Sequence, residues 1–161
     1  MSNKTVSRVA IYVDGFNLYH AIDALKRPHL KWLNLAKLSL LLTKRRSQSV
    51  VVVRYFSAFA NHFSNSPSVD KLLRHRQYVA ALQAKGVVCH MGNFARRDRF
   101  YRGKGYRASW RRYEEKQTDV GIASHLLNDA NKDVFDEAFV ISVDTDLVPV
   151  FDLMRIEHPS K

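Results

Sequence analysis

Cysteine is almost absent from this sequence of 161 residues, since Cys89 is the only one. A single cysteine cannot form an internal disulfide and cannot supply the ligands of a structural zinc site. Long apolar segments are also lacking, because no run approaches the ~18–20 residues that span a bilayer. The first residues, MSNKTVSR, do not contain the apolar core of a signal peptide. These absences favour a cytoplasmic protein with no membrane partner.

Acidic charge is scarce relative to basic charge. Lys and Arg number 26 against 15 Asp and Glu, which gives a formal net charge of +11 and an isoelectric point near 10.0. This excess favours a polyanionic partner, with nucleic acid the leading candidate and an anionic membrane surface the weaker one. Hydrophobic residues still make up 46% of the chain, which is enough for a folded core.

Repeats and linkers are missing as well, so we expect residues 1–161 to form a single domain. Apolar and β-branched segments predict strands at residues 9–13, 49–59, 87–94 and 137–143. Helical patterns and caps predict helices at residues 17–24, 34–43, 70–85, 118–130 and 146–156. Strands that alternate with helices predict an α/β fold with a parallel sheet. The sequence ends with RIEHPSK after the last predicted helix, so we expect either a four-stranded sheet or a missing C-terminal strand.

Carboxylates follow two of the predicted strands and begin one of the predicted helices. Asp14 ends the first strand, Asp144 and Asp146 follow the fourth, and Asp119 starts the helix at 118–130. Loops at the carboxyl ends of parallel strands line a common crevice, so these side chains could converge there. Clustered oxygen ligands are what Mg²⁺ and Mn²⁺ require, and without a cation the carboxylates would repel one another.

Each of these residues also has a purely structural interpretation. Asp14 with Gly15 could form a strand-ending turn, and Asp119 could be an ordinary helix N-cap. Asp144 and its neighbours could likewise cap the last helix. Asn17 could be an N-cap, and His20 fits the surface of a helix better than a ligand position.

Three segments carry a resemblance to a known family. YVDGFNLYH, KQTDVGIASHLL and VISVDTDLVPVF, in that order, resemble the NYN domain, the LabA-like branch of the PIN-like nuclease superfamily. The resemblance covers residues 9–154. It implies a PIN-like three-layer α/β/α sandwich with central strand order 3-2-1-4, normally followed by a fifth strand. It also implies RNA cleavage that depends on Mg²⁺ or Mn²⁺.

The resemblance assigns roles to the first two motifs. The family's first acidic metal ligand corresponds to Asp14, with Asn17 as the neighbouring polar residue. Its helix-start aspartate corresponds to Asp119, and its preceding basic position to Lys116.

In the third motif, the family pattern S-G-D-S-D-F corresponds to residues 142–147, with Asp144 and Asp146 at the acidic positions. Val143 replaces the usual glycine and could crowd the backbone near the metal. The sequence also lacks the family's fifth strand, which would leave one edge of the sheet without its usual neighbour.

A strongly basic segment with interleaved aromatic residues lies at 96–113, RRDRFYRGKGYRASWRRY. Basic groups follow phosphates and aromatic faces stack on unpaired bases, so this segment predicts sequence-tolerant binding of single-stranded nucleic acid. Its glycines suggest a hairpin tip, and the alternative is a solvated loop. The predicted contacts are Arg96, Arg97, Arg99, Arg102, Lys104, Tyr106, Arg107, Trp110, Arg111 and Arg112.

These observations favour a metal-dependent ribonuclease acting on single-stranded or loop RNA. A cation held by Asp14 and Asp144 would activate water for attack on a phosphodiester, with Asp119 and Asp146 completing its surroundings and Lys116 near the phosphate. One alternative is an RNA-binding module with weak or no turnover. Another is a hydrolase of small phosphate esters, although Phe16 stands where a haloacid-dehalogenase-type phosphatase needs a second aspartate. The oligomeric state stays open, a homodimer included.

Overall fold

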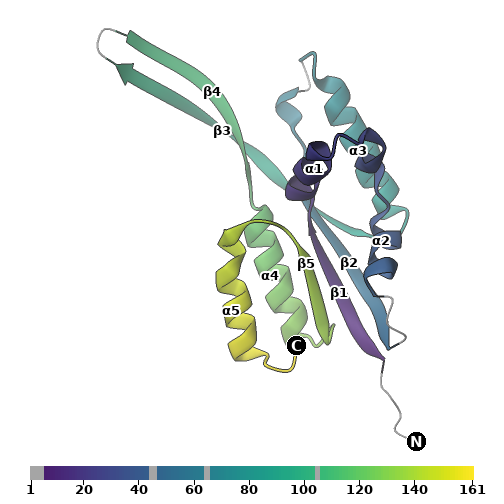
Figure 1. Cartoon of the computed structure of the whole chain (residues 1–161). Helices are drawn as coiled ribbons and strands as arrows, with labels where there is room; N and C mark the ends of the chain where they lie inside the picture. The colour runs from purple at the N-terminus through teal and green to yellow at the C-terminus, as the bar shows by residue number, and fades with distance from the viewer. Residues whose placement is uncertain (1–5, 44–46, 64–65, 104–105) are drawn as a thin grey trace, which may run out of the picture.

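The structure, a computed structural model, describes residues 6–43, 47–63, 66–103 and 106–161, and only the backbone of residues 63, 98–103 and 106–112. The strands are β1 Ser7–Asp14, β2 Gln48–Ala58, β3 Val88–Gly103, β4 Tyr106–Lys116 and β5 Glu137–Ile141. The helices are α1 Gly15–Ala24, α2 Leu35–Leu42, α3 Val69–Gln83, α4 Thr118–Asn131 and α5 Val148–Glu157. Short 3-10 turns occur at η1 Pro28–Trp32, η2 Asn61–Phe63 and η3 Thr145–Leu147 (Figure 1).

The described strands form one sheet in the order β4-β3-β2-β1-β5. β3, β2, β1 and β5 pair in parallel, in the order predicted for the four strands identified in the sequence. β4 adds to this sheet and runs antiparallel to β3. The prediction of four strands was therefore incomplete: the fifth strand precedes α4, and no strand follows α5 in the part of the chain that the structure describes.

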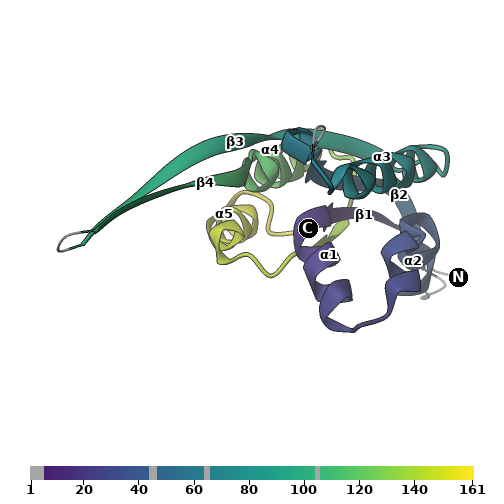
Figure 2. The ribbon, with the colours of Figure 1, turned by 90° about the horizontal axis from the view of Figure 1, so that it is seen from above.

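Helices cover both faces of the sheet, which confirms the predicted α/β class and its layers. On one face Val9, Ile11 and Val13 of β1 pack against residues of α2 and α3. On the other face Ala10 and Tyr12 pack against residues of α4 and α5. Figure 2 shows α4 and α5 on one side of the central strands and α1, α2 and α3 on the other. β1 is buried on both faces because its apolar run has no polar alternation.

The largest departure from the predicted structure is the β3–β4 hairpin. The glycines of residues 96–113 suggested only a hairpin tip, with a solvated loop as the alternative, but residues 96–103 and 106–113 belong to two long strands that pair from Asn93 with Lys116 to Gly103 with Tyr106. Figures 1 and 2 show this hairpin projecting away from the helices. The sequence of this segment lacks the hydrophobic alternation by which other strands are recognised. The expected hairpin tip lies at residues 104–105, outside the described residues.

A buried ion pair attaches α4 to the sheet. Asp129 of α4 accepts hydrogen bonds from the Tyr12 hydroxyl at 2.7 Å and from Arg54 Nε and Nη2 at 2.7 and 2.9 Å. Burial raises the pKa of Tyr12 well above its usual range, and the hydrogen bond to Asp129 acts in the same direction. Because the carboxylate is almost inaccessible and fully partnered, the axis of α4 is fixed relative to β1 and β2.

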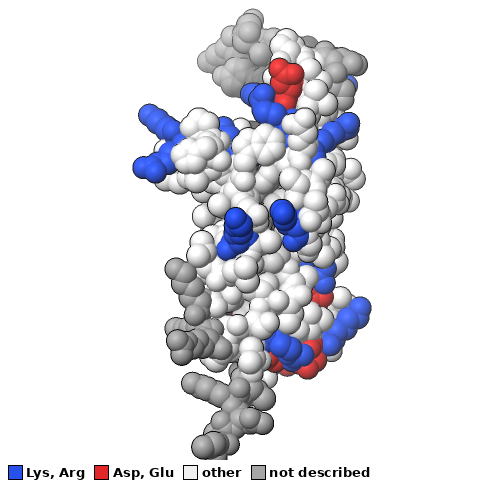
Figure 3. All heavy atoms as spheres, turned by 90° about the vertical axis from the view of Figure 1, so that its right-hand side faces the viewer, with Lys and Arg blue, Asp and Glu red and all other residues white. Residues whose placement is uncertain are grey.

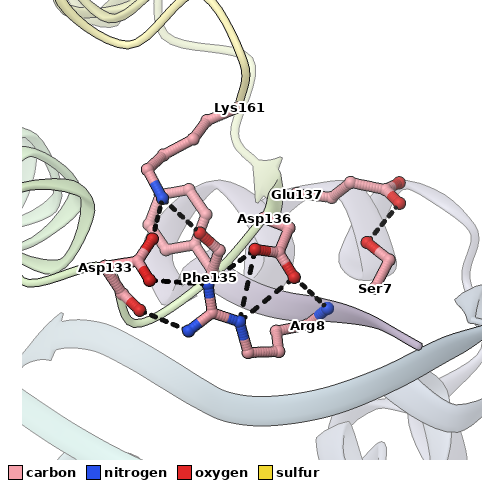
Figure 4. A network of polar contacts seen from close by, with 7 residues as sticks. All are labelled: Ser7, Arg8, Asp133, Phe135, Asp136, Glu137 and Lys161. Carbon is pink, nitrogen blue, oxygen red and sulfur yellow. Dashed lines mark hydrogen bonds and ion pairs between the residues drawn. The ribbon is translucent and has the colours of Figure 1, made fainter. Parts of the chain in front are cut away.

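A second polar network joins chain segments at the opposite end of the sheet (Figure 4). Arg8 at the start of β1 contacts Asp136 Oδ1 at 2.6 Å and Asp133 Oδ2 at 2.9 Å. Lys161 Nζ reaches Asp133 Oδ1 and the carbonyl oxygen of Phe135, both at 2.7 Å. This network ties β1, the α4–β5 connection and the last residue together. No described helix is both long and apolar enough to cross a bilayer.

Candidate active site at the carboxyl edge of the sheet

Asp14 is the last residue of β1 and also the N-cap of α1. Its side chain is 1% exposed and accepts hydrogen bonds from the backbone N–H groups of Phe16 and Asn17 at 3.0 and 2.9 Å. The Asn17 amide and the Ser142 hydroxyl donate to its other oxygen, the latter at 3.0 Å. The cap explains why α1 begins at Gly15, two residues earlier than predicted.

The next residue, Gly15, is required by packing rather than by a tight turn. A Cβ atom there would lie 2.4 Å from the ring of Tyr55, a contact that no side chain tolerates. The glycine therefore allows β2 and the start of α1 to approach each other. This close approach was not foreseen from the sequence.

The segment after β5 is joined directly to Asp14. Ser142 Oγ donates to Asp14 and accepts from the backbone N–H of Asp144 at 3.1 Å. Asp144 in turn caps η3 by accepting from the backbone N–H of Asp146 at 2.9 Å. Asp144 therefore caps η3 and not the last helix, because the N-cap of α5 is Leu147 and has no side-chain hydrogen bond. The hydrogen bonds through Ser142 join this segment to the end of β1. The side chain of Val143 is 79% exposed, so it does not crowd this segment.

Asp119 lies in the first turn of α4, near the other three carboxylates. Its pKa is raised by partial burial and by the negative charges of Asp144, Asp14 and Asp146. The residue that caps α4 is Gln117, so the interpretation of Asp119 as an N-cap is wrong. The structure thus brings all four predicted carboxylates close enough for their charges to act on one another. They follow β1 and β5 or lie in the first turn of α4, and Figure 1 shows where these elements end and begin.

Glu115, near the end of β4, is a fifth carboxylate that the sequence analysis missed. Burial raises its pKa to about 7, and the charges of Asp14 and Asp119 act in the same direction. The hydroxyl of Thr118 donates a hydrogen bond to it. The pair Glu114-Glu115 just before the helix was the available signal in the sequence. Because β4 was not predicted, nothing indicated that either side chain would lie near Asp14.

The corner between β4 and α4 is tightly built. Gln117 has a φ of 82°, in the left-handed region that non-glycine residues seldom adopt. Gly92 of β3 passes so close that a Cβ atom would lie 2.6 Å from the carbonyl oxygen of Lys116. The Lys116 ammonium lies 3.3 Å from Glu114, which also pairs with Arg97 at 3.1 Å. Lys116 therefore has a carboxylate partner next to the site.

The predicted nucleic-acid contacts are only partly described. Arg96 and Arg97 lie near the base of the hairpin, and Arg97 is more than half exposed. The other predicted contacts have side chains outside the described residues: Arg99, Arg102, Lys104, Tyr106, Arg107, Trp110, Arg111 and Arg112. Their backbones, apart from residue 104, belong to β3 or β4.

The donors at this edge fit a hard divalent cation by chemical type, because they are carboxylate, amide and hydroxyl oxygens. Asp14, however, already accepts from four donors within the protein. Among the residues that the structure describes, no three His, Cys, Asp or Glu side chains form a ready-made metal site. The carboxylates are coupled through their charges, and a cation would have to draw them closer.

Comparison with known proteins adds one finding. The NYN domain matches residues 8–159, nearly the whole chain. No curated protein and no solved structure gave a significant match. The match covers all three motif segments and, apart from Ser7 of β1, every strand and helix described above. The chain therefore belongs to the NYN domain family, within the PIN-like nuclease superfamily.

Proposed function

We propose that this protein is a metal-dependent ribonuclease that cleaves single-stranded or loop RNA. The observation that carries the proposal is the convergence of carboxylates from three separate chain segments at one sheet edge, in a chain with a net charge of +11. Negative charges held together in a basic protein favour a bound cation and a polyanionic substrate. The motifs around Asp14, Asp119 and Asp144 support an assignment to the LabA-like branch of the family.

The residues take the following roles in this proposal. Asp14 and Asp144 hold Mg²⁺ or Mn²⁺, and Asp119 and Asp146 complete its surroundings. The ion would polarise the phosphodiester and lower the pKa of a bound water. Asn17 fixes the orientation of the Asp14 carboxylate, since its amide donates to that group. Lys116, whose ammonium pairs with Glu114 and is partly exposed, would exchange this partner for a substrate phosphate.

The direct test is incubation of purified protein with labelled single-stranded RNA, with and without Mn²⁺, beside Asp144→Asn. We expect cleavage only with the metal, and a loss on the order of 100-fold in the variant, since several kcal/mol of transition-state stabilisation depend on the ion. Asp152→Asn is the matched control, because it removes an exposed carboxylate of α5 whose partner is Arg155. Equal cleavage by the native protein and Asp144→Asn would show that a contaminant does the work.

A second candidate function is RNA binding with little or no turnover. The saturation of Asp14 by four internal donors favours it, because those hydrogen bonds compete with a metal for the same oxygens. On this alternative, the native protein binds RNA but does not cleave it at any concentration of Mg²⁺ or Mn²⁺. RNA affinity measured in EDTA, set beside the cleavage assay, separates the two candidates.

A further inference from the structure

A groove of about 610 Å³ opens directly beside the acidic edge, between α1, η1 and α3. Gly15 and Phe16, which follow Asp14 in the chain, form part of its wall. The ring of Phe16 contacts Phe94 of β3 at a centroid distance of 6.5 Å, and Phe94 pairs in register with Glu115. Phe16 and Phe94 therefore line the groove and are also the neighbours of Asp14 and Glu115, so the groove adjoins the carboxylates.

The groove presents aromatic faces to solvent. Phe16, Tyr19 and Trp32 all line it, and they are 42%, 44% and 49% exposed. Large rings left this accessible are unusual on a soluble protein, and here they gather around one cavity. Lys31 Nζ lies over one face of the Tyr19 ring, 4.8 Å from its centroid, and the exposed parts of these rings can stack on the flat face of an unpaired base.

Polar groups meet at the floor of the groove. The hydroxyls of Tyr55 and Ser57 each lie 3.4 Å from Nε2 of His75, and both of these residues are nearly inaccessible. Burial lowers the pKa of His75, which keeps its ring neutral at pH 7 and able to donate or accept. A few convergent polar groups in a mainly apolar cavity are typical of a small-ligand site.

The rim of the groove is basic. Lys31 is paired with Asp23 at 2.5 Å, but Lys71 and Arg74 form no ion pair with any carboxylate in the described part of the chain. Figure 3, which views the side of the molecule that carries α2 and α3, shows basic groups spread across this face and acidic groups only toward its ends. Unpaired cations beside exposed rings complement the phosphates and bases of a nucleotide.

We propose that this groove binds a base of the RNA strand next to the cleavage site, stacked against Tyr19 and Trp32, with Lys71 and Arg74 holding the adjoining phosphate. The inference rests on RNA being the partner proposed above but does not depend on cleavage. It assigns a subsite that touches the β3–β4 hairpin only at Phe94, near the base of the hairpin, and is otherwise formed by α1, η1, α3 and the end of β2.

Trp32 supplies a direct readout. The sequence contains Trp32 and Trp110, so Trp110→Phe leaves Trp32 as the sole tryptophan. In this background, carrying Asp144→Asn and kept in EDTA, we expect AMP or UMP to quench Trp32 fluorescence saturably. Ribose 5-phosphate carries the phosphate without a base and should have little effect. Equal quenching by ribose 5-phosphate would show a phosphate site only and would overturn the proposal.

Variants then separate stacking from charge. Tyr19→Ala should weaken binding of a short single-stranded RNA by about 5- to 150-fold, while Tyr19→Phe, which keeps the ring, should retain affinity. Lys71→Gln with Arg74→Gln should reduce affinity and its salt dependence. Lys37→Gln with Lys132→Gln removes the same charge from exposed sites outside the groove. This control pair should reduce RNA affinity and its salt dependence much less.

The outcomes distinguish this inference from the proposed function. If the groove variants bind RNA as tightly as the control pair while the native protein still cleaves, the subsite is wrong and the nuclease proposal stands. If the groove binds nucleotides but Asp144→Asn leaves cleavage unchanged, only the nuclease proposal fails. Displacement of RNA from the groove by polyglutamate as readily as by unlabelled RNA would indicate an acidic protein partner and would overturn the assignment of a base.

Discussion

Asp14 is both a helix cap and a candidate metal ligand, and the two roles can be separated by experiment. Asparagine keeps an acceptor for the N–H groups of Phe16 and Asn17, so Asp14→Asn should preserve the start of α1. Its amide nitrogen would face the donors of Asn17 and Ser142, so some stability is lost as well, and each protein is compared with itself in EDTA. The change removes the charge that a divalent cation would use. The local fold should therefore survive while metal affinity falls.

We predict that Mn²⁺ raises the melting temperature of the native protein, because a ligand that binds only the folded state stabilises it. At 100 times Kd the gain is about 2.7 kcal/mol, or roughly 5–11 °C for a domain of this size. Asp14→Asn should show much less of this rise, and Asp152→Asn should show all of it. Thermal unfolding in EDTA and in Mn²⁺ provides the measurement. A rise of the same size in Asp14→Asn would place the ion elsewhere.

Glu115 gives a prediction with a defined pH window. Its pKa is raised from 4.5 to about 7 in the folded protein, so the folded state holds this proton more tightly than the unfolded state. The associated stability is complete below about pH 4.5 and is lost as the pH rises through 7. Solvent screening of this half-buried side chain reduces the effect to about 1 kcal/mol.

Glu115→Gln should accordingly raise the melting temperature by about 2–4 °C at pH 8 in EDTA and leave it unchanged near pH 4.5. Glutamine can still accept the hydrogen bond from Thr118. Melting curves of both proteins from pH 4.5 to 8 test this difference. A lower melting temperature for the variant at pH 8 would mean that the ionised carboxylate stabilises the fold instead.

At the scale of elements, the hairpin shows what the sequence could and could not reveal. β1 and β2 were predicted because their apolar and β-branched runs pack within the sheet, and α2 and α4 because of their caps and periodicity. β4 was not predicted, because its basic and aromatic residues show no alternation of apolar and polar positions. Glu115 was missed for the same reason, since its position depends on the pairing of β4 with β3.

The hairpin carries the prediction for RNA affinity. Neutralising Arg97, Arg99 and Arg102 together should weaken RNA binding and flatten its salt dependence, since each lost phosphate contact removes about 0.7 from the slope for a single strand. Asp144→Asn should leave affinity intact or raise it, because a negative charge near phosphate has gone. Affinity measured across a salt series tests both statements. If the triple variant binds like the native protein at every salt concentration, the basic footprint lies elsewhere on the molecule.

Across the whole molecule, the two ends of the sheet differ in the charges that they bring together. At the carboxyl end, burial and then the like charges gathered there raise the pKa of Asp119, which is unfavourable for the fold without a cation. The opposite end gathers opposite charges around Arg8, whose guanidinium lowers the pKa of Asp136 to about 2. The sequence revealed the first set through its motifs, but the second depends on three distant segments and left no local pattern.

This arrangement predicts that stability and activity can be changed independently. Arg8→Gln should lower the melting temperature at pH 7, because it removes ion pairs that join β1 to the α4–β5 connection. The pKa of Asp136 is depressed in the folded protein, so this contribution is present at neutral pH and is lost as the pH falls toward 2. The difference between native and variant melting temperatures should therefore shrink on acidification.

Arg155→Gln is the control for this change, because it breaks a single exposed ion pair within α5 and should have a small effect. Cleavage per folded molecule should be the same in Arg8→Gln and the native protein, since β1 is buried between Arg8 and Asp14 and holds the distant carboxylate in place. Thermal unfolding at several pH values, with RNA cleavage measured well below the melting temperature, tests both parts. Loss of cleavage in fully folded Arg8→Gln would show that the two ends of the sheet are coupled, and that β1 transmits changes in the polar network to the acidic edge.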